Sequence, residues 1–107
     1  MAWLFLFIAG FFEIIWAVGM KYTDGFSKIV PTAAVFVAML LSVYFLSIAV
    51  KTIPVGTAYA VWTGIGIVGT TIWGIAVFDE PFGFFRVFFI SLIIISIVGL
   101  RLIAKPI

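Results

Sequence analysis

The sequence predicts an all-α integral membrane protein with four transmembrane helices. Of its 107 residues, 66% are hydrophobic and 9% are charged, which leaves too few polar side chains to cover a soluble domain. The chain also divides into four apolar runs, at residues 2–20, 31–50, 57–78 and 84–103. Each run has roughly the 20 residues that a helix needs to cross the hydrocarbon layer. We therefore expect a single four-helix transmembrane domain over residues 1–107.

Charged and turn-forming residues mark the ends of these runs. The first run ends at Lys21, and the second begins at Pro31, whose missing N–H suits a first helical turn. The third run follows Pro54 and ends before the sequence DEPFG, and Lys105 closes the fourth. Helix is required within each run because an unpaired backbone amide in lipid is very costly.

The basic residues are balanced between the two sides of the membrane. With four spans, the two termini and the second loop share one side. That side holds three basic residues and so does the other: Lys51, Arg101 and Lys105 against Lys21, Lys28 and Arg86. The positive-inside rule therefore favours neither orientation. We expect the chain to insert both ways and to pair with an inverted copy of itself, as an antiparallel, dual-topology homodimer. The alternative is one orientation set by another feature.

Composition disfavours several classes of function. The chain has no cysteine and no histidine, so it lacks thiolate and imidazole metal ligands. Its net charge of +2 offers no basic patch for nucleic acid. No nucleophile is paired with a base, and the GxG at 64–66 does not follow a strand. We expect neither an enzyme nor a cofactor or metal.

Glu13 is the sole ionisable side chain well inside a predicted span. Such residues usually face a bundle interior and mark an ion or proton pathway. Trp16 follows at i+3 on the same helix face, where its ring can attract a cation and its N–H can orient a carboxylate. One carboxyl group can hold a proton or a cation, but not both, which is the chemistry an antiporter needs. The alternative is a protonated glutamic acid that joins two helices in a non-transporting membrane assembly subunit.

The third run is the least lipid-like. Small residues recur every four positions in two sets, a spacing that lets helices approach closely: Gly56, Ala60 and Gly64, and Gly66, Thr70 and Gly74. Tyr59 and Trp62 place a hydroxyl and an indole near the same side. Two glycines mid-helix, Gly64 and Gly66, are consistent with a kink or hinge. In the second run, Ser42 either faces the interior or bonds its own backbone.

These residues together resemble the small multidrug resistance family. The resemblance covers essentially the whole chain and is most specific around Glu13 and in the sequence IPVGTAYAVWTGIG. It implies an antiparallel homodimer in the inner (plasma) membrane, in which Glu13 binds protons and cationic substrates in competition. The sequences EIIWA and WTGIG are similar to the guanidinium-exporter branch. That branch implies a hydrogen-bonded set around the glutamate, formed here by Trp16, Ser42, Tyr59 and Trp62.

The resemblance has one departure and leaves two alternatives. Phe89 and Ser96 stand where the family commonly has a glycine-based dimerisation motif, so that contact is expected to be repacked. The alternative substrates are quaternary ammonium or lipophilic aromatic cations, whose exporters typically have a small residue in place of Trp16. The alternative assembly is a heterodimer with a related partner.

Overall fold

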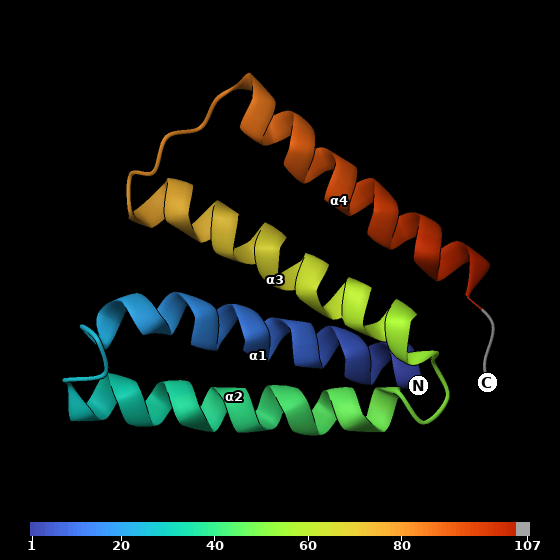
Figure 1. Ribbon diagram of the computed structural model, residues 1–107, viewed down its shortest axis with the longest axis horizontal. Helices are drawn as coiled ribbons and strands as arrows, with labels where there is room; N and C mark the ends of the chain where they lie inside the picture. Colours follow the sequence, from blue (N-terminus) through green and yellow to red (C-terminus); the bar gives the residue numbers. More distant parts are fainter. Residues whose placement is uncertain (105–107) are drawn as a thin grey trace.

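The computed structural model describes residues 1–104 as four helices joined by short linkers (Figure 1). The helices are α1 (Ala2–Tyr22), α2 (Ile29–Ala49), α3 (Val55–Val77) and α4 (Phe84–Ile103). All four are long and apolar enough to cross a membrane, which agrees with the predicted all-helical fold. Lys105, which enters the charge balance above, lies outside the described residues.

The helix ends differ slightly from the predicted spans. α1 runs two residues further, to Tyr22, and Lys21 in its last turn lies 4.5 Å from the centroid of the Phe78 ring. α2 begins two residues earlier, so Pro31 falls inside the first turn, where a backbone N–H has no helical partner. A basic residue or a proline in the sequence indicates that a helix end is near. Either residue can still lie inside the helix, which then extends about half a turn beyond the predicted end.

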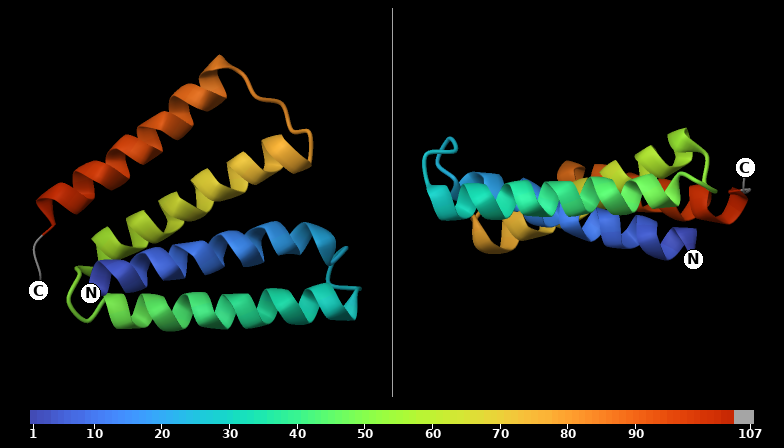
Figure 2. Two further views of the ribbon diagram at one scale, coloured as in Figure 1. Left: turned by 180° about the vertical axis from the view of Figure 1, so that it is seen from behind. Right: turned by 90° about the horizontal axis from the view of Figure 1, so that it is seen from below.

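The helices lie side by side in a thin layer. α1 packs between α2 and α3, and α4 packs along α3 on the far side from α1 (Figures 1 and 2). At its C-terminal end α4 also reaches α1, where Arg101 lies over the Trp3 ring. The layer measures 42 × 35 × 17 Å between Cα atoms. A small core gathers near the start of α1, formed by Leu6, Ala49, Ile53, Ala58 and Val61. No residue of α4 is buried, so most of its apolar side chains are exposed in this single chain.

The linker between α1 and α2 is held by the buried residue Thr23. Its hydroxyl donates to the Met20 carbonyl over 2.7 Å and accepts the Phe26 N–H over 3.1 Å. The Thr23 carbonyl accepts the backbone N–H groups of Ser27 and Lys28. These bonds satisfy backbone groups that the end of α1 leaves free.

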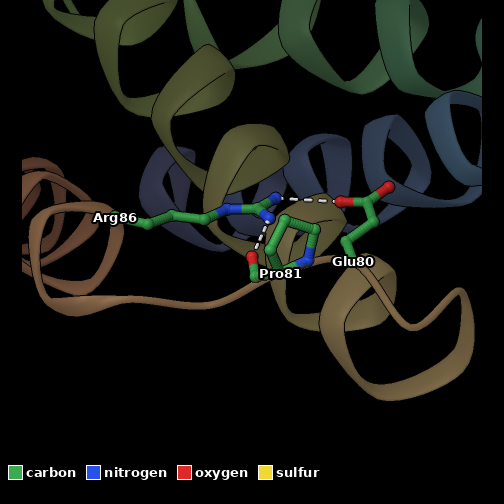
Figure 3. Close-up of polar contacts among 3 residues, drawn as sticks. All are labelled: Glu80, Pro81 and Arg86. Atoms are coloured by element: carbon green, nitrogen blue, oxygen red, sulfur yellow. Dashed lines mark hydrogen bonds and ion pairs between the residues drawn. The ribbon is translucent and has the colours of Figure 1, made fainter.

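The linker between α3 and α4 is held by an ion pair (Figure 3). Arg86 donates to the Glu80 carboxylate over 2.9 Å and to the Pro81 carbonyl over 2.6 Å. The Glu80 N–H donates to the carbonyl of Gly74 in the last turn of α3. The first turn of α4 is thereby tied to the last turn of α3.

Candidate functional site

Glu13 lies near the middle of α1, where α1 packs against α3. Its carboxyl group occupies the space beside Gly66. A Cβ atom at Gly66 would lie 2.6 Å from Glu13 Cδ and 2.7 and 2.9 Å from the carboxyl oxygens. Gly66 is buried, so its missing side chain is what makes space for the carboxyl group inside the protein.

The same side of α3 meets α1 through other glycine contacts. A Cβ atom at Gly10 of α1 would lie 2.7 Å from a methyl carbon of Ile65, and one at Gly69 of α3 would collide with Ile14. Small residues on both helices therefore allow the close approach that places Glu13 against α3. Gly66 of the predicted small-residue sets takes part in this contact, whereas Gly10 and Gly69 belong to neither set.

Two buried polar atoms on this face of α1 have no hydrogen-bond partner among residues 1–104. They are Oε2 of Glu13 and Nε1 of Trp16, an acceptor and a donor one helical turn apart. Among residues 1–104 the ion pair is the one between Arg86 and Glu80 in the α3–α4 linker. Glu13 therefore has no basic partner among these residues. Buried polar groups are nearly always hydrogen-bonded, so these two atoms are available to a water, an ion or a polar ligand.

Ser42 and Trp62 form a hydrogen-bonded chain across three helices. The Trp62 indole N–H donates to the Ser42 hydroxyl over 2.9 Å, and that hydroxyl donates to the Ala9 carbonyl over 2.7 Å. Ser42 is completely buried. The carbonyl of Ala9 lies one turn before Glu13, so this chain fixes α2 and α3 against α1 next to the carboxyl group.

Tyr59 lies at the edge of this group. Its ring centroid is 5.5 Å from that of Trp62, and 57% of the residue is exposed. Within residues 1–104 its hydroxyl group makes no hydrogen bond. The structure thus brings Ser42, Trp62 and Tyr59 together, and leaves Trp16 beside Glu13 without a hydrogen bond to them.

Gly64 and Gly66 lie in different packing contacts. α3 is one helix from Val55 to Val77, and a Cβ atom at Gly64 would lie 2.8 Å from Ile97 Cδ1 on α4. Gly66 instead faces Glu13. The spacing predicted a packing role for both glycines but not which neighbour each one faces, and the hinge stays a prediction.

Comparison with known proteins now decides the family. A family model described as Small Multidrug Resistance protein matches residues 1–93. The chain belongs to the small multidrug resistance family. Membership and the four apolar helices together make it a multi-pass protein of the inner membrane.

Several curated members of the small multidrug resistance family are similar to the chain over nearly its full length. A protein of Proteus vulgaris named guanidinium exporter is 50% identical over 102 residues, covering 95% of this chain and 98% of the relative. Guanidinium exporters of Salmonella typhimurium and Escherichia coli are 50% and 49% identical, covering 97% and 95% of this chain and 99% and 97% of the relatives. The predicted resemblance to this family and its guanidinium-exporter branch is confirmed.

Proposed function

We propose that the chain is a proton-coupled antiporter that exports guanidinium or small guanidinyl cations. Relatives of about half identical sequence carry the name guanidinium exporter and align with nearly the whole chain. Glu13 is the residue that binds a proton or the cation in turn. Because the two ligands compete for one carboxyl group, inward movement of protons drives outward movement of the cation.

The observation that carries this proposal is the unpartnered pair of buried atoms on α1, Glu13 Oε2 and Trp16 Nε1. Guanidinium is planar and donates several hydrogen bonds, a geometry that matches a carboxylate. The Trp16 N–H can orient the carboxyl group, and its ring face can attract the cation. The hydrogen bonds from Trp62 to Ser42 and from Ser42 to the Ala9 carbonyl keep the surrounding helices in place while a proton and a cation exchange at Glu13.

A second, inverted copy completes the site in this proposal. One copy is a layer only 17 Å thick between Cα atoms, and α4 buries no residue within it. Two copies facing each other enclose a cation between their Glu13 residues. Exchange of conformation between the two halves then gives alternating access, with Gly64 and Gly66 as the proposed hinge of α3. Phe89 and Ser96 lie on the exposed surface of α4, where a repacked contact between copies would form.

The test is uptake of guanidinium into liposomes that contain the purified protein, driven by an outwardly directed proton gradient. We expect uptake that collapses with the gradient and is abolished by Glu13→Gln, because an amide carries neither the charge nor the exchangeable proton. Glu80→Gln makes the same chemical change in the α3–α4 linker and should leave transport within about twofold. Gradient-independent flux, or equal flux with Glu13→Gln, would reject the mechanism.

The same liposomes separate the alternatives. Faster transport of a small quaternary ammonium ion than of guanidinium would favour the alternative of a quaternary ammonium or aromatic cation exporter. In that case Trp16→Gly should leave transport of the quaternary ammonium ion intact. An assembly subunit would transport neither cation, and Glu13→Gln would change only the stability of its oligomer. Crosslinking of a single type of chain in opposite orientations tests the homodimer against a heterodimer.

A further inference from the structure

The two ends of the helix layer differ in charge. The terminal end, where α1 begins, α2 joins α3 and α4 finishes (Figures 1 and 2), holds Lys51 and Arg101. None of the chain's four acidic residues lies there, because Glu13 is mid-helix and the others are at the opposite end: Asp24, Asp79 and Glu80. The opposite end balances its basic residues with these three acids. Among the described residues, the charged side chains at the terminal end are therefore all basic.

A cavity of about 300 Å³ opens at the terminal end. Its walls come from three elements that are distant in sequence: Trp3 of α1, Thr52 and Pro54 of the α2–α3 linker, and Arg101 and Ala104 at the end of α4. The Arg101 guanidinium lies 4.8 Å from the centroid of the Trp3 ring. Stacking on an aromatic face restrains the guanidinium while its N–H groups stay free to donate.

Arg101 has no ion-pair partner within the described residues, where the ion pair is the one at the opposite end between Arg86 and Glu80. A guanidinium whose N–H groups make no hydrogen bond within residues 1–104 can bind a phosphate group through two donors. The Thr52 hydroxyl in the cavity wall can add a further donor. The site thus combines charge, fixed geometry and a concave shape.

We propose that this cavity binds the headgroup phosphate of an anionic membrane phospholipid. Trp3 and Arg101 lie near helix ends, at the height where tryptophan and basic residues meet lipid headgroups. Basic pockets between transmembrane helices are suited to anionic headgroups. The proposal goes beyond the transport function, since the cavity does not include Glu13, Trp16, Ser42 or Trp62.

The test is native mass spectrometry of the full-length protein released from a non-ionic detergent. The probes are phosphatidylglycerol, phosphatidylcholine of the same acyl chains, and inorganic phosphate added at constant ionic strength. We expect retention of phosphatidylglycerol over phosphatidylcholine and a loss of about tenfold in its affinity with Arg101→Gln, the size of a lost charged hydrogen bond. Lys51→Gln, which removes the same charge from the same end but not from the cavity wall, should change the affinity less than twofold.

A second variant covers the case in which Arg101→Gln fails to fold. Arg101→Lys keeps the charge but loses the bidentate fork, and should weaken phosphatidylglycerol binding several-fold. Equal retention of the two lipids, or equal losses with Arg101→Gln and Lys51→Gln, would overturn the proposal in favour of diffuse attraction. Binding of inorganic phosphate that blocks the cavity without any lipid preference would also overturn it, because the ligand would then be a free anion.

Discussion

Replacing Gly66 by alanine is a direct way to move the Glu13 carboxyl group without changing any charge. The added Cβ atom would lie 2.6 Å from Glu13 Cδ, whereas carbon atoms in contact normally lie about 3.5–4.0 Å apart. The carboxyl group must therefore retreat by about 1 Å. It is the far end of a flexible side chain, so it can move while the helices stay in place.

The size of this clash sets the expected effects of Gly66→Ala on the free energy of unfolding and on guanidinium uptake. Overpacking costs about 1–3 kcal/mol, and alanine regains about 1 kcal/mol of helix propensity over glycine. We expect a net loss of stability of about 0–2 kcal/mol, with the protein still folded. A misplacement of about 1 Å at a reacting group can cost about a hundredfold in rate. Gradient-driven guanidinium uptake should therefore fall by about tenfold to a hundredfold.

The matched control is Gly56→Ala in the same helix. A Cβ atom at Gly56 meets nothing within 4 Å, so this variant makes the same chemical change without touching Glu13. Uptake in liposomes and thermal unfolding in detergent should be measured for both variants. Wild-type uptake by a folded Gly66→Ala protein, or an equal loss with Gly56→Ala, would refute the assignment of Gly66 as the residue that makes space for the carboxyl group.

Three further predictions follow from individual contacts. Gly64→Ala should destabilise the protein by a net of about 0–2 kcal/mol, because its clash with Ile97 Cδ1 is partly offset by helix propensity. Adding Ile97→Val should restore thermal stability and uptake; no restoration would favour the hinge over packing. Ser42→Ala should cost about 1 kcal/mol in unfolding experiments because it leaves the part-buried Trp62 N–H unpaired. Adding Trp62→Phe should cost less than the sum of the two single changes; strict additivity would contradict the hydrogen bonds from Trp62 through Ser42 to Ala9. Arg86→Gln should change the free energy of unfolding by less than about 1 kcal/mol, because the ion pair in the α3–α4 linker is about one-third exposed. A larger loss that persists at high salt would show that the hydrogen bond from Arg86 to the Pro81 carbonyl contributes more than the ion pair.

The helices could be predicted from the sequence because lipid leaves the chain few choices. Apolar runs of about 20 residues must be helical, and the four helices of the structure follow those runs. The exact ends could not be predicted. Lys21 ends the first apolar run but stays in α1, 4.5 Å from the Phe78 ring centroid, and Pro31 suits any position of a first turn.

The sequence singles out candidate site residues, but it does not give the contacts that they make. Glu13 is conspicuous because it is the lone carboxyl group in an apolar run. Gly64 and Gly66 are two positions apart, about 200° around a helix, and one faces α4 while the other faces Glu13. A helical wheel does not say which neighbour lies opposite each residue. The acceptor for Ser42 is a backbone carbonyl, that of Ala9, which no side-chain pattern can reveal.

Some polar side chains of the interior have hydrogen-bond partners and others have none, and this difference helps to distinguish a structural role for Glu13 from a ligand-binding role. Ser42 and Trp62 complete each other's hydrogen bonds, as structural polar groups do. The Glu13 carboxyl group instead lies in the space beside Gly66. Its Oε2 atom has no hydrogen-bond donor among residues 1–104. A role in joining helices would then require a donor from a second copy. Glutamine at this position can accept and donate such a bond but cannot hold a cation by charge. Assembly that survives Glu13→Gln while guanidinium binding is lost would therefore assign the carboxyl group to ligand binding.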